Sequence, residues 1–157
     1  MKNIHLFREE VLTRTLSLVD EPYEKWRTYN YQINTKLFFA NEDINGSFNL
    51  NNGELPLLEC KLEDSYVLIT TDRIISILDS EMDQISIQDI DHFGNEFEKE
   101  NFKIVEGKGP KTNTILLVAS KGDKLKFKID SLYPAYFAKI LIHNLINIKN
   151  KGTYSWG

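Results

Sequence analysis

Cysteine is nearly absent from this sequence, since Cys60 is the one cysteine among 157 residues. A lone cysteine cannot close a disulfide within the chain, which indicates a reducing compartment. Long apolar runs are missing too: no stretch approaches the roughly 18 apolar residues of a membrane-spanning helix. Arg8, Glu9 and Glu10 interrupt the region where a signal peptide would need its apolar centre. The sequence therefore predicts a cytoplasmic protein, in which the sequon at residues 45–47 is simply a turn.

The patterns of common enzyme chemistry are also missing. The three histidines, His5, His92 and His143, are far apart in sequence and have no metal-binding spacing. Cys60 lies between two charged residues in an expected strand, where a buried inert thiol is favoured over a nucleophile. The run Gly107-Lys108-Gly109-Pro110-Lys111 differs from a phosphate-binding loop because no Ser or Thr follows its Gly-Lys pair. We therefore expect a non-catalytic protein that needs no cofactor.

The residues at two required positions exclude a calcium-binding loop in the acidic stretch that begins at Asp79. Asp79, Glu81 and Asp83 have the spacing of the first three ligands of such a loop. Its sixth position should be glycine and is Gln84, and its twelfth should be glutamate and is Ile90. We therefore expect no metal site here, and we expect these carboxylates to lie on a solvated acidic hairpin.

Charge is present in quantity but is unevenly distributed. The net charge is −4. Residues 79–100 carry one basic and eight acidic side chains, a net −7, whereas residues 101–157 carry ten basic and three acidic side chains, a net +7. Such clustering sets association rates and the charge of a partner, but not the fold. The acidic balance argues against a general nucleic-acid binder.

Short β-forming runs separated by turn residues fill the chain from residue 41 onward. Asn45-Gly46 and Asn52-Gly53 are turn dipeptides because both residue types tolerate positive φ. The most strongly patterned stretch, residues 66–90, contains two runs on either side of a tight Thr71-Asp72 turn. The strands that we expect cover residues 47–50, 55–62, 66–70, 73–78, 85–90, 102–105, 114–119 and 125–129.

The first forty residues are harder to assign. Ile4, Phe7 and Val11 have helical spacing and predict a helix over residues 3–13, but a strand over 15–19 is equally compatible with the pattern. A short helix near residue 23 and a strand near residue 30 are both consistent with the aromatic-rich stretch that follows. We expect residues 1–40 to form an extension packed on the domain.

A helix over about residues 132–149 ends the domain. Ser131 is a plausible N-cap, and Pro134 falls in the first turn, where its missing N–H is tolerated. The helix carries a broad apolar stripe, made of Tyr133, Phe137, Ile140, Leu141, Leu145 and Ile148. We expect the domain to span residues 41–151 and to be followed by a tail, residues 152–157.

Several antiparallel strands followed by one amphipathic helix is the order of a pleckstrin-homology-like (PH-like) domain. The run Val67-Leu68-Ile69-Thr70-Thr71-Asp72-Arg73-Ile74-Ile75 resembles the strand, Thr-x-x-Arg, strand corner of bacterial PH-like and GRAM-like domains. Residues 85–90 resemble their next strand, and Leu125-Lys126-Phe127-Lys128 before the helix resembles their ending. The resemblance covers residues 45–149. It implies a mainly β fold in which a strongly bent antiparallel sheet or barrel is capped by the helix, and such folds are more often binding scaffolds than enzymes.

Two charged segments are candidate binding sites. Lysines of the last strand alternate with apolar residues and so project from one face of that strand. Lysines before the strand extend the positive charge. The candidate lysines are Lys108, Lys111, Lys121, Lys124, Lys126 and Lys128. This set would attract an anionic membrane surface or a phosphorylated ligand. The acidic segment combines carboxylates with two aromatic anchors, and its candidate residues are Asp79, Glu81, Asp83, Asp91, Phe93, Glu96, Phe97 and Glu98.

The acidic segment gives the leading functional hypothesis. It is suited to docking a protein partner that has a basic surface, and an immunity protein that neutralises a cationic toxin is a specific form of this idea. The alternative is a peripheral module that binds anionic lipid or a phosphorylated ligand through the lysines. Both segments are also compatible with ordinary solvated surface.

Overall fold

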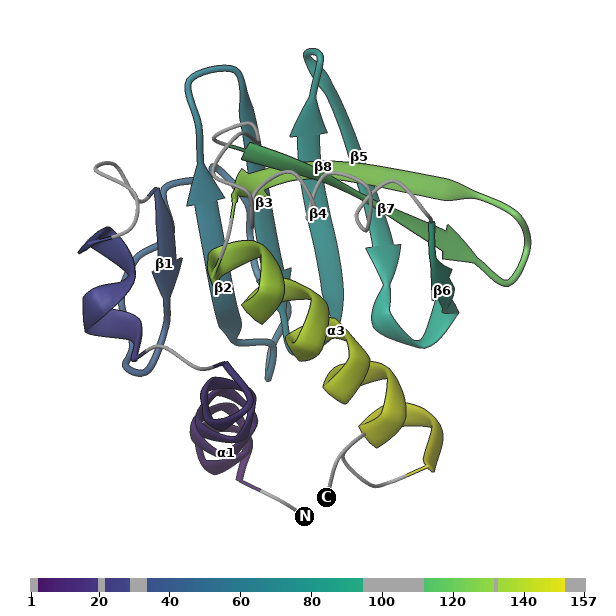
Figure 1. Cartoon of the computed structure of the whole chain (residues 1–157). Coiled ribbons are helices and arrows are strands. Elements are labelled where there is room, and N and C mark those ends of the chain that lie inside the picture. The colour runs from purple at the N-terminus through teal and green to yellow at the C-terminus, as the bar shows by residue number, and fades with distance from the viewer. Residues whose placement is uncertain (1–2, 20–21, 29–33, 95–111, 132, 152–157) are drawn as a thin grey trace.

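The computed structural model of the chain describes residues 3–19, 22–28, 34–94, 112–131 and 133–151 (Figure 1). The strands expected near residue 30 and over 102–105, and the tail, lie outside these ranges. The described residues form a mixed fold of two antiparallel sheets with helices packed on one side, and its C-terminal helix is α3 (Tyr133–Lys151).

The first sheet has five strands in the order β1-β2-β3-β4-β5, so each strand pairs with its neighbour in the sequence. Its strands are β1 (Thr35–Leu37), β2 (Pro56–Lys61), β3 (Ser65–Thr70), β4 (Arg73–Leu78) and β5 (Glu81–Ser86). The expected strands at 55–62, 66–70 and 73–78 are confirmed, with the Thr71-Asp72 turn between the last two. Their short β-branched runs, bounded by turn residues, determine these strands locally.

The second sheet has three strands in the order β6-β7-β8: β6 (Ile90–Phe93), β7 (Thr112–Ala119) and β8 (Lys124–Asp130). Over residues 85–90 the sequence predicts one strand with a bend, and the bend is present but it ends the strand. A 3₁₀ turn, η2 (Ile87–Asp89), divides it, so that Ile85 belongs to the first sheet and Ile90 to the second. Ile87 is fully buried in this turn and its N–H donates to the Asp72 carbonyl, which stabilises the change of direction.

No closed barrel forms among the described residues. Instead of pairing with an edge of the first sheet, β8 crosses its inner face, and Figure 1 shows β7 and β8 running across the strands behind them. The contact is direct, since Ser76 Oγ on β4 donates to the Lys126 carbonyl at 2.7 Å. The expectation of one bent sheet or barrel is therefore corrected to two stacked antiparallel sheets, because the described strands of the two sheets cross without forming a shared ladder.

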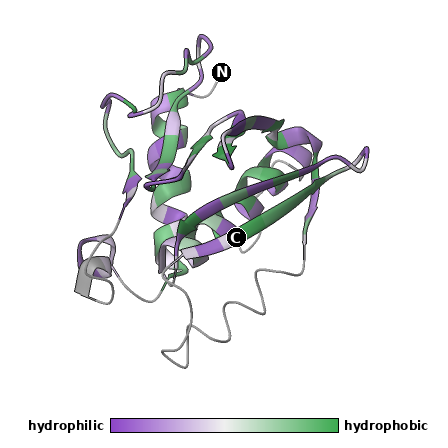
Figure 2. Ribbon diagram, turned by 90° about the horizontal axis from the view of Figure 1, so that it is seen from above, coloured by the Kyte–Doolittle hydropathy of each residue, from purple (hydrophilic) through white to green (hydrophobic). Residues whose placement is uncertain are grey.

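The main core lies between the two sheets and the helices. Alternate residues of β8, namely Leu125, Phe127 and Ile129, are buried there, as the alternating pattern predicts. The helix α3 adds Phe137, Leu141 and Leu145 from the expected stripe. Figure 2 shows hydrophobic residues concentrated on the elements that enclose this core and hydrophilic residues toward the hairpin ends.

The N-terminal elements are part of this core. The helix α1 (Ile4–Ser17) confirms the expected helix and extends it through Ser17, so the alternative strand over 15–19 is wrong. Asn144 on α3 donates to the hydroxyl of Thr15, which joins the two helices. A 3₁₀ turn, η1 (Tyr23–Thr28), places Trp26 against Phe137. No helix in the described ranges is long and apolar enough to cross a membrane.

A second apolar cluster covers the outer face of the five-stranded sheet. It contains Tyr66 and Leu68 and is covered by Phe48 and Leu50 from the segment before β2. The strand expected over residues 47–50 is therefore wrong: the segment is irregular and buries these two side chains against a sheet face that would otherwise be open. Gly46 is required by this packing, since a Cβ there would lie 2.7 Å from the Phe48 ring and from Tyr66 Oη.

Three buried carboxylates attach irregular segments to the sheets. Asp130 accepts from the backbone N–H of Asn34 at 2.6 Å, and Glu59 from that of Asn45 at 2.6 Å. Glu54 accepts from the N–H of Asn51 at 2.9 Å. Each of these bonds satisfies a backbone donor that lies outside any helix or strand, so these acidic residues are structural.

Candidate functional site

The hairpin between β4 and β5 carries the first acidic residues of the candidate segment. Asp79 and Ser80 form its turn with φ values of 54° and 65°. The strand β5 then begins at Glu81, four residues before the expected strand. The sequence did not predict this start because Glu81, Asp83 and Gln84 are exposed polar residues that break the apolar pattern of a strand. Met82 is 60% exposed beside them, an apolar side chain on an otherwise polar strand.

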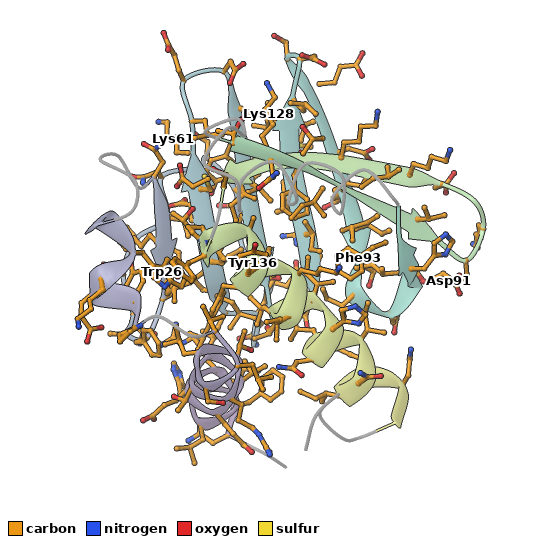
Figure 3. All side chains as sticks on the ribbon, in the orientation of Figure 1. Trp26, Lys61, Asp91, Phe93, Lys128 and Tyr136 are labelled. Carbon is orange, nitrogen blue, oxygen red and sulfur yellow. The ribbon has the colours of Figure 1, made fainter. Side chains whose placement is uncertain are left out.

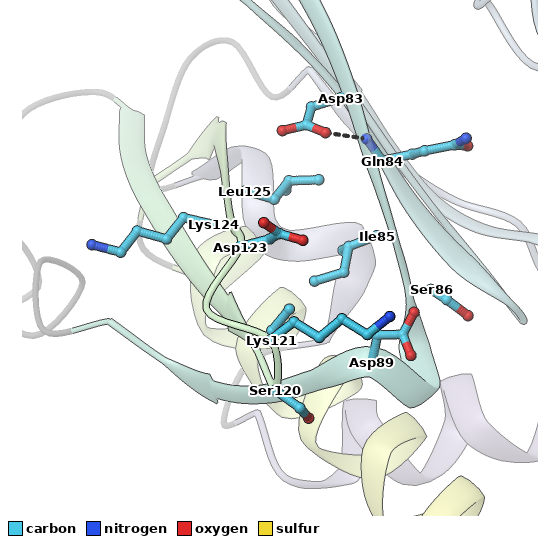
Figure 4. Close-up of a pocket in the computed structure, with 11 residues that line it drawn as sticks. Asp83, Gln84, Ile85, Ser86, Asp89, Ser120, Lys121, Asp123, Lys124 and Leu125 are labelled. Carbon is cyan, nitrogen blue, oxygen red and sulfur yellow. Dashed lines mark hydrogen bonds between the residues drawn. The ribbon is translucent and has the colours of Figure 1, made fainter.

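Two adjoining cavities lie between this hairpin and the second sheet. The larger, of about 400 Å³, is bounded by β5, η2 and the turn between β7 and β8 (Figure 4). The smaller, of about 270 Å³, lies between the β4–β5 turn and β8. Asp83 and Lys124 line both cavities, so together they form one feature, which we call the inter-sheet groove.

The inter-sheet groove brings together residues from the two candidate segments. Its acidic residues come from β5 and the turns, and its lysines come from β8 and the turn before it. The charged residues that line it are Asp79, Glu81, Asp83, Asp89, Asp123, Lys121, Lys124 and Lys126. The two segments that the sequence offered as rival sites therefore face each other across one groove.

Comparison with protein-family models, with curated proteins and with solved structures finds no match to this chain.

The charged residues that line the groove form no ion pairs within the part of the chain that the structure describes. Lys121 points toward Asp89 in Figure 4 without forming an ion pair, and no carboxylate pairs with Lys124 or Lys126. Lys128 differs, because its Nζ lies 3.3 Å from Asp64 at the end of the β2–β3 hairpin. Lys124, Lys126 and Lys128 project from one face of β8, which confirms the alternation read from the sequence.

The remaining candidate residues do not join the groove. Asp91 and Phe93 lie on β6, away from the β4–β5 turn (Figures 1 and 3). Phe93 is half-buried against His143 of α3, with ring centroids 4.9 Å apart, so its ring packs on the domain. The other candidates lie outside the described residues: Glu96, Phe97, Glu98, Lys108 and Lys111.

Neither Cys60 nor His143 lines the inter-sheet groove. Burial and the nearby Asp130 raise the pKa of the Cys60 thiol to about 12, so it stays protonated. Burial, with a contribution from Lys139, lowers the pKa of His143. Among the described residues no cluster of three His, Cys, Asp or Glu side chains is suited to hold a metal ion.

The sequence did not reveal the floor of the inter-sheet groove. Ile85 and Leu125 line it beside the charged residues, and both read from sequence only as core positions. Asp89 and Asp123 were also missed as neighbours, although both stand next to turns. The turns that flank β5 and β8 were the one signal in the sequence that could have pointed to Asp89 and Asp123. The proximity of these turns, however, depends on how the two sheets cross.

Proposed function

We propose that this chain is a non-catalytic, cytoplasmic binding protein of PH-like architecture that recognises a protein partner along the inter-sheet groove and the β4–β5 hairpin. Two antiparallel sheets followed by a C-terminal helix support the architecture. The observation that carries the binding role is the row of unpaired charges of both signs beside an exposed methionine.

The charge pattern favours a protein over a membrane. An anionic lipid surface presents one sign of charge, so it would attract Lys124 and Lys126 but be repelled by Glu81 and Asp83 on the facing strand. A protein surface can carry both signs and match each side of the groove. The alternative, binding of anionic lipid or a phosphorylated ligand through the lysines, is therefore the less favoured proposal.

A partner with a basic docking surface fits the acidic hairpin best. Asp79, Glu81 and Asp83 lie within five residues at the end of the protruding β4–β5 hairpin, where they would speed the association of a cationic protein. Neutralisation of a cationic toxin is the specific form of this proposal.

The test compares two variants that change the charge by the same amount. Immobilised wild-type protein is exposed to lysate of the native host, and a retained protein is purified and its Kd measured by calorimetry. The variant Glu81→Gln/Asp83→Asn should weaken binding at least about tenfold, whereas Glu9→Gln/Glu10→Gln on the exposed side of α1 should not.

The same experiment addresses the alternative. Wild-type protein should not pellet with phosphatidylserine vesicles at physiological salt. Pelleting that Lys124→Gln/Lys126→Gln abolishes, together with equal partner binding by wild type and Glu81→Gln/Asp83→Asn, would overturn the protein-partner proposal.

A further inference from the structure

The strand β5 is an edge of the five-stranded sheet. Its one strand partner in the described residues is β4, with the register Arg73↔Ser86 through Leu78↔Glu81. Figure 1 shows its hairpin extending beyond the crossing strands β7 and β8. The inter-sheet groove runs along it, so neither β7 nor β8 packs tightly over this strand. An exposed edge of this kind is a template for one more strand.

The backbone groups that face this edge follow from the register. Ile87 N–H donates to the Asp72 carbonyl at 2.9 Å, and in an antiparallel ladder such paired positions recur at every second residue. Ile85, Asp83 and Glu81 therefore turn their N–H and C=O groups toward β4. Met82, Gln84 and Ser86 turn theirs outward, to the free edge.

A side-chain hydrogen bond supports the outward direction of the backbone N–H at Gln84. The N–H of Gln84 is bonded to the carboxylate of Asp83 at 2.9 Å, which a donor engaged by β4 would not allow (Figure 4). This bond satisfies an outward donor that would otherwise be left to solvent. It is easily exchanged, because both residues are exposed.

We propose that β5 binds an extended basic segment of the protein partner as an added β-strand; this deepens the proposed function and rests on it. The acidic side chains of Glu81 and Asp83 would lie opposite lysine or arginine on one face of the added strand. Met82, on the other face, would contact its apolar or neutral residues. A second copy of this chain is excluded as the preferred occupant, because pairing two β5 edges would bring the same carboxylates together.

A proline substitution isolates the backbone contribution. Because the N–H of Gln84 faces outward, Gln84→Pro removes a donor of the free edge and leaves the β4–β5 ladder intact. It also removes the bond from Arg73 Nη1 to the Gln84 side chain, at 2.9 Å. The matched control is Gln84→Ala, which loses the same side-chain bond but keeps the N–H.

The probe is a fluorescein-labelled peptide of about eight alternating lysine and threonine residues, measured by anisotropy against a glutamate–threonine peptide of equal length. Wild type and Gln84→Ala should bind the lysine peptide and not the glutamate peptide. Gln84→Pro should bind the lysine peptide about tenfold more weakly, since a lost hydrogen bond and its unpaired partner group weaken binding by this order. Equal binding by Gln84→Pro and Gln84→Ala would overturn strand addition, as would equal binding of both peptides by wild type.

Hydrogen exchange on the wild-type protein gives a readout that does not depend on the folding of a variant. On adding the lysine peptide, the amides of Met82 and Ser86 should become protected, whereas those of Asp83 and Ile85, already directed toward β4, should not change. Unchanged exchange at Met82 and Ser86 with the peptide bound would contradict the proposal.

The two proposals fail in distinguishable ways. If the purified partner is lost by Glu81→Gln/Asp83→Asn but kept by Gln84→Pro, the groove binds a protein through side chains and strand addition is wrong. If neither variant changes partner binding, the proposed function is wrong as well. A dimer of the free protein that Gln84→Pro dissociates would show that the edge is occupied by a second copy instead.

Discussion

Replacing Arg73 with methionine should destabilise this protein more than replacing Glu54 with glutamine, although the two side chains form one ion pair. Arg73 Nε and Nη2 donate to the carboxylate of Glu54 at 2.9 and 3.2 Å. The side chain of Glu54 is fully buried, whereas that of Arg73 is 21% exposed. The pair joins β4 to the segment that covers the outer face of the sheet.

The magnitude follows from this asymmetry. In Arg73→Met a buried carboxylate loses its charged partner, and such losses lower the free energy of unfolding by about 3–5 kcal/mol. In Glu54→Gln the guanidinium still reaches solvent, Gln84 and the Asn49 carbonyl, so the loss should be about 2 kcal/mol. For a domain of this length, Arg73→Met should lower Tm by about 10 °C. The double variant should be more stable than Arg73→Met alone, because no unpaired charge stays buried.

The assay is urea unfolding at pH 7 followed by tryptophan fluorescence, since Trp26 is buried in the core. The control is Lys149→Met, which removes an exposed ion pair to Asp72 at 3.4 Å and should cost less than about 1 kcal/mol. Equal or greater stability of Arg73→Met relative to Glu54→Gln would refute this prediction, as would a double variant that loses the sum of the two single effects.

The pH dependence of the same pair has a defined sign. Burial alone would raise the pKa of Glu54, but the bonds from Arg73, Thr70 and Asn51 outweigh it and lower that pKa below its ordinary value. The pair therefore stabilises the fold above the unfolded-state pKa of 4.5 and loses this contribution as the pH falls further. The stability difference between wild type and Arg73→Met should accordingly shrink as the pH is lowered below about 4.5.

Two further predictions concern the hairpin turn and a helix histidine. Ser80→Gly should raise the free energy of unfolding by about 0.5–1 kcal/mol in the same urea assay, because Ser80 has a φ of 65° that glycine adopts without strain, and an unchanged or lower stability would contradict this. His143 should titrate below its ordinary pKa of 6.5 in an NMR pH series, because burial and Lys139 disfavour its charged form. Its neutral ring then contributes stability that is lost as the pH falls below 6.5, and a titration midpoint at or above that value would refute the prediction.

Local pattern predicted the elements that depend on neighbouring residues. The hairpin of β3 and β4, the alternation of β8 and the helix α3 were all predicted from the sequence, because periodicity and turn residues act over a few positions. The start of β5 was not, since Glu81, Asp83 and Gln84 have low strand propensity. The segment over residues 47–50 was predicted wrongly because alternation also arises where an irregular segment buries every second side chain.

The candidate site was predictable only in its parts. The sequence by itself determined that Asp79, Glu81 and Asp83 form one charged group and that Lys124 and Lys126 share one face of a strand. Their meeting in one groove was decided by the tertiary structure, because β8 crosses the inner face of the first sheet and is held there by the Ser76–Lys126 bond. The same holds for Glu54, Glu59 and Asp130, which composition alone would place in solvent. Asp130 and Glu59 accept from backbone donors 96 and 14 residues away, and Glu54 accepts from Arg73, 19 residues away. Such non-local pairing leaves no periodic signal in the sequence.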